Sequence, residues 1–469
     1  MYPIYEIDDA QAANIMATQE NYLTDIKARE IKPAKLSETI SAFANAAGGD
    51  VYIGIGEDKV TNTRTWKGFD DPEQANDFFH TLFQAHPFAN HVKFEFLRGG
   101  NLPGLVLHIT IKKVKEIVKS SSGDVFVRVN AGKQKIDTPE KVKRLELDKG
   151  IITFENEWVE VPLPKIENSL SILNFLINVI PTGEPLTYLN NQELVKEGHA
   201  RVCGVLLFCD EPAVFLPKRS SIKIARYKTK DDDIGREFLD GNPITVEGDA
   251  YNLVYSAVAQ TKKVIEGIRR LGEEGLEAVE YPEEALHEVI TNAVLHRDYS
   301  IVADVQIRVF DNRVEVESPG TLPGHVTTAN ILDTQSARNP ALVRLINKFP
   351  NPPNKDLGEG LDTAFRAMET LRLKPPVILE KDASALVLIR HESLGSPEEL
   401  VMRYMDSRAE ITNSVAREIT GIKSENSMKN VFLRLKARNM LEPIPERKGS
   451  ASAWRKPVAA EEDDTSPLS

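Results

Sequence analysis

Three side chains that could carry out nucleotide chemistry lie along one predicted helix. In the stretch YPEEALHEVITNAVLHRDYS, Glu288, Asn292 and His296 follow one another at i, i+4 and i+8, so they share one face of a helix over Tyr281–Ser300. A carboxylate can orient an attacking water, and a carboxamide oxygen can ligate Mg²⁺. The spacing therefore indicates a nucleotide-hydrolysis site with Glu288 as the base and Asn292 as a metal ligand. The alternative is a solvated glutamate beside a packing asparagine.

The segments that follow this helix are expected to place backbone groups around the same site. ADVQIRVFDNRVEVES alternates as two strands, and the Asp311-Asn312 pair is a hairpin turn signal. Farther on, Gly358 and Gly360 precede a predicted helix. Bare backbone N–H groups at a helix N-terminus can hold phosphates, although such glycines also mark ordinary helix starts.

The order of these blocks resembles the divergent GHKL-type ATPase domain of bacterial ATP-binding regulators in the helicase-related family. Glu288 and Asn292, with NAVLHRDYS, are similar to its N box, and VEVESPGTLPG, SARNPAL and DLGEGLDTAF follow in the family's order. The resemblance implies ATP as the ligand, Mg²⁺ on Asn292 and His296 beside the nucleotide. It also implies that Arg338 contacts a phosphate, for which a structural salt bridge is the rival explanation.

The chain departs from the family at the loop Ser318–Gly324, which stands where GHKL proteins have D-x-G-x-G. The aspartate that holds the adenine amino group is missing, so Glu317 or Ser318 would have to serve. Pro319 and Gly320 keep the turn that lets a nucleotide approach the backbone. Selectivity for adenine is therefore expected to be poor.

A second recognisable region lies near the N-terminus. Leu36–Ala47 has apolar residues at helical spacing, two glycines end that helix, and VYIGIG begins a buried strand. Three segments resemble the Schlafen/AlbA-type domain: TDIKARE, then SAFANAAGGDVYIGIGED, and FVRVNAGKQ farther downstream. The resemblance covers roughly Glu20–Leu147.

Nuclease-active Schlafen proteins carry three acidic residues and a lysine, which this resemblance places at Glu20, Asp25, Asp58 and Lys27. Clustered carboxylates can hold Mg²⁺ or Mn²⁺ against a phosphodiester while a lysine neutralises developing charge. Asp25 is one methylene shorter than the glutamate that the family usually has. The alternative is that Lys27 and Arg29 bind nucleic-acid phosphates without cleavage.

The middle of the chain carries fewer signals. VPLPKIENS resembles a linker, VCGVLLFCDEP is expected to be a buried strand, and SIKIARYK a second strand. Tyr251–Leu271 is predicted to form a long amphipathic helix. The only cysteines, Cys203 and Cys209, have neither a metal-site nor a disulfide spacing, which fits packing in a reducing compartment.

The last folded region is expected to be a winged helix. PEELVMRYMDS, TNSVAREIT and Ser424–Asn439 read as three helices, the third being the recognition helix. Between Lys423 and Lys456 the chain has nine Lys or Arg and three Asp or Glu, although its net charge is −12. This local reversal is typical of a duplex binder, and protein contact is the alternative. The acidic tail, residues 458–469, is predicted to be disordered.

These observations predict an α+β multidomain fold. The expected domains are a Schlafen/AlbA-like α/β domain at 1–150, a connecting α/β segment at 151–275, a GHKL-like α/β sandwich at 276–395 and a winged helix-turn-helix at 396–457. With 41% hydrophobic residues, no apolar run near ~18 residues and no basic and apolar leader at MYPIYEIDDA, a cytoplasmic protein without membrane contact is expected.

Three functions follow as hypotheses. The first is an ATP-binding regulator of transcription or of the response to foreign DNA, with DNA on the winged helix and DNA or RNA on the N-terminal domain. A slow ATPase activity and a homo-oligomer are compatible with it. The second is a metal-dependent ribonuclease using Glu20, Asp25 and Asp58. The third is a non-catalytic assembly protein with a degenerate ATPase fold.

Overall fold

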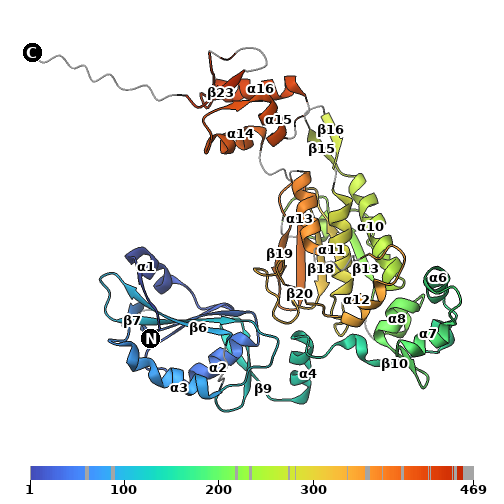
Figure 1. Ribbon diagram of the computed structural model, residues 1–469, viewed down its shortest axis with the longest axis horizontal. Helices are drawn as coiled ribbons and strands as arrows, with labels where there is room; N and C mark the ends of the chain where they lie inside the picture. Colours follow the sequence, from blue (N-terminus) through green and yellow to red (C-terminus); the bar gives the residue numbers. More distant parts are fainter. Residues whose placement is uncertain are drawn as a thin grey trace, which may run out of the picture.

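The chain folds into an N-terminal unit, a large central unit and a small C-terminal unit (Figure 1). The computed structural model describes residues 2–457 apart from 59–62, 86–89, 217–219, 232–234, 273–274, 280, 335, 354–359, 372, 392–395, 421, 423, 446 and 448–451. The predicted acidic tail lies outside the described residues. The mixed helices and sheets confirm the α+β multidomain fold class.

The N-terminal unit is built around a five-stranded sheet in the order β1-β6-β7-β3-β2. Its elements are β1 (Ile4–Ile7), α1 (Asp9–Ala17), β2 (Thr24–Lys27), α2 (Pro33–Ala44), β3 (Gly48–Ile53), β4 (Ile55–Asp58), β5 (Thr63–Trp66), η1 (Pro72–Ala75), α3 (Asn76–Ala85), β6 (Val92–Gly99), β7 (Leu105–Lys112), β8 (Val125–Val129), β9 (Gly132–Ile136) and α4 (Pro139–Asp148). Strands β1 and β2 pair in parallel with β6 and β3, whereas β7 pairs antiparallel with both of its neighbours.

Helix α2 packs on this sheet through the apolar residues that its spacing predicted. Leu36, Ile40 and Phe43 are fully buried against the strands. The helix ends at Ala44 with Asn45 as its C-cap, so the two glycines do not end it as predicted but are the first residues of β3. Gly49 has φ +149°, and a Cβ there would lie 2.3 Å from the carbonyl oxygen of Leu23 and 2.7 Å from the Phe43 ring. Only glycine fits this close approach between α2, β3 and the residues before β2.

The central unit contains a six-stranded sheet in the order β14-β13-β17-β18-β20-β19. Its elements are η2 (Phe154–Asn156), β10 (Trp158–Glu160), α5 (Pro164–Glu167), α6 (Leu170–Val179), α7 (Pro185–Asn191), β11 (Val195–Lys196), β12 (His199–Arg201), α8 (Val202–Phe208), α9 (Pro212–Phe215), β13 (Ile222–Arg226), η3 (Arg236–Phe238), β14 (Ile244–Val246), α10 (Ala250–Glu266), β15 (Arg269–Gly272), β16 (Gly275–Ala278), α11 (Glu283–Leu295), β17 (Val305–Val309), β18 (Arg313–Pro319), α12 (Pro340–Ile346), α13 (Gly360–Thr370), β19 (Val377–Glu380) and β20 (Ser384–Arg390).

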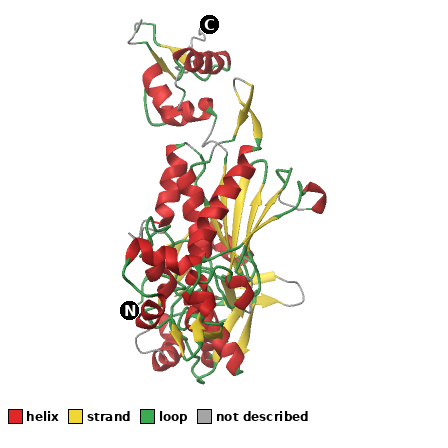
Figure 2. Cartoon of the chain, turned by 90° about the vertical axis from the view of Figure 1, so that its right-hand side faces the viewer, coloured by secondary structure: helices red, strands yellow, loops and turns green. Residues whose placement is uncertain are grey.

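Helices α10, α11 and α13 lie side by side on one face of this sheet (Figures 1 and 2). Strands β17 and β18 form the predicted antiparallel hairpin. Strand β13 pairs in parallel with β17, and one buried cluster runs from Val161 to Ile389. The segment at 151–275 therefore contributes strands and a helix to the same sheet and core. The expected boundary at residue 276 does not separate two bodies.

The C-terminal unit has its own small core. Its elements are α14 (Pro397–Met405), β21 (Ile411–Thr412), α15 (Asn413–Thr420), α16 (Glu425–Ala437), β22 (Glu442–Pro443) and β23 (Ala453–Arg455), with the strand order β21-β23-β22. Phe432 of α16 stacks on Trp454 with ring centroids 5.0 Å apart. The three predicted helices are present, and Met428, Val431, Phe432 and Leu435 form the buried stripe of α16.

Several local predictions were wrong. Val202–Phe208 is a helix, not a strand, because a short apolar run buried on all sides has no period that distinguishes the two. The predicted linker contains α5, whose Ile166 is fully buried in the central core. The helix predicted to extend to Leu271 ends at Glu266, and the helix predicted to extend to Ser300 ends at Leu295.

Candidate functional site

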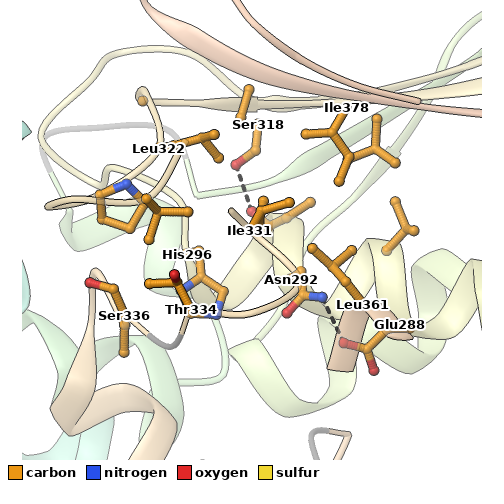
Figure 3. Close-up of a pocket in the computed structure, with 18 of the residues that line it drawn as sticks. Glu288, Asn292, His296, Ser318, Leu322, Ile331, Thr334, Ser336, Leu361 and Ile378 are labelled. Atoms are coloured by element: carbon orange, nitrogen blue, oxygen red, sulfur yellow. Dashed lines mark hydrogen bonds between the residues drawn. The ribbon is translucent and has the colours of Figure 1, made fainter. Parts of the chain in front are cut away.

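A cavity of about 360 Å³ lies between α11, α13, the sheet and the loop after β18 (Figure 3). Small-molecule sites usually begin near 300 Å³. The lining is mostly apolar, including Leu322, Ile331, Leu361 and Ile378. The polar side chains around it belong to Glu288, Asn292, His296, Ser318, Thr321, Thr334, Ser336 and Asp362.

Glu288 and Asn292 meet on the cavity side of α11, as their spacing predicted. The amide nitrogen Nδ2 of Asn292 donates a 2.6 Å hydrogen bond to Oε1 of Glu288. Burial raises the pKa of Glu288, and the hydrogen bond from Asn292 only partly offsets this shift. Because the amide nitrogen faces Glu288, the amide oxygen of Asn292 points away from it and can accept a ligand (Figure 3). The pair combines a carboxyl group suited to proton transfer with a neutral oxygen suited to Mg²⁺.

His296 also lines the cavity, although it no longer belongs to the helix. Its backbone has φ −102° and ψ 6°, and it caps the C-terminus of α11 by donating to the carbonyl oxygen of Asn292. The three predicted residues therefore line one cavity, Glu288 and Asn292 from α11 and His296 from its C-cap.

Ser318 and Glu317 are the two candidates for holding the adenine ring. Ser318 faces the cavity, and Glu317 does not. Ser318 donates a 2.7 Å hydrogen bond to the carbonyl oxygen of Ala293 in α11, which leaves only its lone pairs for a ligand. Glu317 lies on the opposite face of β18 and pairs with Arg308 and Lys381. Burial raises the pKa of Glu317, but bonds from Ser384, Arg308 and Lys381 outweigh it and lower the pKa to about 2.

Pro319 and Gly320 form the predicted turn at the end of β18. Gly320 has φ +105°, and a Cβ there would lie 2.6 Å from the Cβ of Asp298. The backbone N–H of Asp298 donates a 2.8 Å hydrogen bond to the carbonyl oxygen of Pro319. The glycine therefore lets the loop lie directly on the segment that follows α11, and Gly320 lines the cavity.

Arg338 is not among the residues that line the cavity. Its side chain is 4% exposed and lies 3.3 Å from the carboxylate of Asp298. It also donates to the carbonyl oxygens of Thr321, at 2.6 Å, and Leu147, at 3.1 Å. This geometry matches the structural salt bridge that the sequence left open for Arg338, because both terminal nitrogens of its guanidinium donate to protein acceptors.

Asp298 is the centre of this buried network. Its carboxylate pairs with Arg338 and with Arg144 of α4, and it accepts hydrogen bonds from the backbone and hydroxyl of Ser300 at 2.9 and 2.5 Å. Burial raises the pKa of Asp298, but Arg338, Ser300 and Arg144 outweigh it and hold the pKa below its ordinary value. The sequence carries no signal for this role of Asp298, because its partners come from distant segments.

Asn339 and Pro340 have structural positions beside Arg338. The amide Nδ2 of Asn339 donates 2.8 Å hydrogen bonds to the carbonyl oxygens of Leu295 and Arg297, which satisfies the end of α11. Pro340 begins α12. Asn339 therefore fixes the end of the helix that carries Glu288 and Asn292.

The second glycine site is only partly described. Gly358 lies outside the described residues, and Gly360 is the first residue of α13, as predicted. Leu361 and Asp362 of the first turn of α13 line the cavity. None of the described lining residues is Lys or Arg, so an anionic ligand would depend on the α13 N-terminus and on a bound cation.

The N-terminal acidic residues are tied to basic partners. Lys27 lies 2.7 Å from Asp25 and 3.2 Å from Glu20, and Arg128 lies 3.4 Å from Asp25. Burial raises the pKa of Asp25, which the Lys27 and Arg128 charges only partly offset. Asp58 ends β4, and its side chain lies outside the described ones. Among the side chains that are described, no group of three His, Cys, Asp or Glu is arranged to hold a metal ion.

The exposed basic residues of the C-terminal unit fall into two groups. Several form ion pairs within the unit, such as Arg434 with Glu398 at 2.6 Å and Arg455 with Glu442 at 2.7 Å. Lys429 and Lys436 are exposed on α16 and lie seven residues apart, which places them on the same helical face. In the part of the chain that is described, no helix has the length and apolar character needed to cross a membrane.

Two family models match parts of this chain. Residues 20–137 match the model described as "Schlafen, AlbA_2", and residues 303–389 match the model described as "Putative ATP-dependent DNA helicase recG C-terminal". The second match begins after α11, so it includes Ser318 and Arg338 but not Glu288 or Asn292. No curated protein matches the chain.

The solved structures that match include one that aligns over nearly the whole length. The crystal structure of the DIP2311 protein from Corynebacterium diphtheriae aligns with 96% of this chain and 96% of its own, at 18% identity and a TM-score of 0.41. That score is too low to transfer either architecture or function.

Proposed function

We propose that this protein is an ATP-binding, nucleic-acid-binding regulator. The matches to the Schlafen AlbA_2 model and to the recG C-terminal model support a nucleic-acid-related protein with an ATPase-like domain. In this proposal the cavity beside α11 binds a nucleotide, and the N-terminal and C-terminal units contact nucleic acid. The observation that supports it most is the pairing of Glu288 with Asn292 on the wall of a ligand-sized cavity.

The residues present fit a magnesium nucleotide. Mg²⁺ commonly takes only one or two protein oxygens and completes its shell with water and phosphate, so the amide oxygen of Asn292 suffices as a ligand. The first turn of α13 offers backbone N–H groups at the cavity. Glu288, with its raised pKa, is placed to accept a proton from water. The test is titration of the protein with ATP in the presence of Mg²⁺ and again with EDTA.

The cavity is expected to discriminate poorly between ATP and GTP. Ser318 offers an acceptor but no carboxylate, and Glu317 points to the other face of the sheet. Sites that hydrogen-bond a specific group reject analogues by ~10⁴–10⁵-fold, whereas a site without that bond discriminates far less. We expect the dissociation constants for ATP and GTP to differ by less than about tenfold, with Glu317→Gln leaving their ratio unchanged. A ratio above ~100-fold would contradict this assignment of Ser318 and Glu317.

We further propose that the C-terminal unit is a winged helix that binds duplex DNA through α16. Lys429 and Lys436 are expected to contact phosphates. In the Lys429→Ala, Lys436→Ala double variant, the slope of log affinity against log salt concentration should fall by ~2. The matched control is the double variant Lys165→Ala, Lys263→Ala, which removes the same charge at exposed sites elsewhere. Equal DNA affinity and slope for the test variant and the unmodified protein would favour a protein-contact role.

The N-terminal domain is proposed to contact nucleic acid, and cleavage is best tested at Glu20. Asp25 is 1% exposed and faces the buried Arg128, so Asp25→Ala should destabilise the protein by ~3–5 kcal/mol. Loss of cleavage in that variant would be ambiguous. Glu20 is partly exposed, and Glu20→Gln should keep the stability measured by thermal unfolding. RNA cleavage with Mn²⁺ that persists in Glu20→Gln would exclude a catalytic role for Glu20.

A further inference from the structure

The loop over the cavity is held by groups from two domains. We call residues 320–323, all of which line the cavity, the roof. The Gly320 N–H donates to the carbonyl oxygen of Ala383 at 2.8 Å, and the Leu322 N–H donates to Oε1 of Glu380 at 2.9 Å. The carbonyl oxygen of Leu322 accepts a 2.8 Å hydrogen bond from Nζ of Lys113. Lys113 belongs to the N-terminal unit, where it directly follows β7.

Lys113, Glu380 and the Leu322 backbone form a closed set of contacts, which we call the clasp. Nζ of Lys113 lies 3.4 Å from the same Oε1 of Glu380 that accepts from the Leu322 N–H. The Lys113 side chain is 8% exposed. Burial lowers the pKa of Lys113, and the nearby Glu380 charge partly offsets the shift. The position of a buried ammonium is fixed by its carboxylate and carbonyl partners, because losing either partner leaves the buried charge poorly compensated.

A second connection runs through α4. Arg338 holds the roof at the carbonyl oxygen of Thr321 and also donates to the carbonyl oxygen of Leu147, while Arg144 pairs with Asp298. The end of α4 is in turn fixed to the rest of the N-terminal unit. Lys149, which is 2% exposed, donates to the carbonyl oxygens of Ala44 at 3.1 Å and Val114 at 2.6 Å. The roof, α4, α2 and the exit of β7 are thus joined by direct hydrogen bonds.

The loop between Glu20 and Asp25 is fixed within the N-terminal unit. Arg128 holds the loop in place by donating to the carbonyl oxygens of Asn21 and Thr24.

We propose that the N-terminal unit fixes the roof of the nucleotide cavity, with Lys113 as the positioning residue that acts through Leu322 and Glu380. Cavity occupancy and the N-terminal unit are then coupled. A nucleotide that shifts the roof changes the Lys113 contacts. By reciprocity, if the nucleotide changes the binding free energy of a ligand on the N-terminal unit, that ligand changes the binding free energy of the nucleotide by the same amount. This inference rests on the proposed function, because it takes the cavity ligand to be a nucleotide.

The test compares Lys113→Met with Lys112→Met in the full chain. Lys112 is the exposed neighbour at the end of β7 and serves as the matched control. Calorimetry with ATP and Mg²⁺ measures the affinity for the nucleotide. Hydrogen exchange with and without nucleotide measures the exchange rates of the backbone amides in β7 and α4. We expect nucleotide to alter exchange at residues 105–116 and 139–149 in the unmodified protein and in Lys112→Met. In Lys113→Met this response should be lost, and affinity should weaken about 5–150-fold, the range of common coupling energies.

A conservative variant separates positioning from general packing. Glu380→Gln keeps an oxygen for the Leu322 N–H but removes the charge that faces Lys113, so its affinity should fall between the unmodified protein and Lys113→Met. The unmodified protein alone also decides the question, whatever the stability of the variants. Nucleotide binding without any change in exchange at residues 105–116 would overturn the coupling and leave the proposed nucleotide site intact. Absence of nucleotide binding would contradict the proposed function and this inference together.

Discussion

Replacing Glu288 by glutamine is expected to lower the rate of ATP hydrolysis by ~10²–10⁴-fold, the usual contribution of a general base, while nucleotide remains bound. The glutamine keeps the shape of the side chain and an oxygen for the hydrogen bond from Asn292. It cannot take a proton from water. The hydrolysis rate of the unmodified protein should also rise with pH through a value above the ordinary glutamate pKa near ~4.3, because burial raises the pKa of Glu288.

The matched control is Glu284→Gln. Glu284 lies on the same helix, one turn before Glu288, and is exposed. Its replacement should change neither binding nor turnover. If Glu288→Gln hydrolyses ATP at the unmodified rate while binding normally, Glu288 is not the base and the activity belongs to another group.

Replacing Asp298 by alanine is expected to lower the free energy of unfolding by ~3–5 kcal/mol, because it leaves buried Arg338 without its carboxylate partner. Asp298 is 2% exposed and connects Arg338, Arg144 and Ser300. Urea unfolding of the full chain provides the measurement. The control is Asp148→Ala, which removes the other, half-exposed partner of Arg144 and should cost at most ~1 kcal/mol. Equal losses in the two variants would show that Asp298 is not the centre of the network.

The same network predicts a dependence of stability on pH. The folded-state pKa of Asp298 lies below its unfolded value near ~3.9, so its contribution is fully present above that value. The contribution is lost as the pH falls through the folded-state pKa. Asp298→Ala should therefore be less sensitive to acid below about pH 4 than the unmodified protein.

The contacts and elements that the sequence predicted correctly are local in the chain. Glu288 and Asn292 are one helical turn apart, so the period of the helix alone places them together. The hairpin of β17 and β18 likewise follows from alternation around a short turn. The run at Val202–Phe208 was misassigned because complete burial removes the periodicity that identifies an element.

The parts that could not be predicted join distant segments. Lys113 and Glu380 are 267 residues apart, and Arg144 and Asp298 are 154 residues apart. Neither pair has a spacing signal, because their proximity depends on how the N-terminal unit packs on the central unit. For the same reason, Arg338 could be read from sequence either as a phosphate contact or as a salt-bridge partner, and only its buried contact with Asp298 distinguishes the two.

Isothermal titration of the full chain with ATP and Mg²⁺, alongside Asn292→Ala, measures whether the cavity beside α11 binds a magnesium nucleotide. We expect a saturable heat for the unmodified protein that is lost with EDTA and strongly weakened in Asn292→Ala. Asn174→Ala, an exposed asparagine on α6, should bind as the unmodified protein does. No heat with either ATP or GTP in the unmodified protein would contradict nucleotide binding, and the cavity beside α11 would then belong to a fold that has lost its ligand.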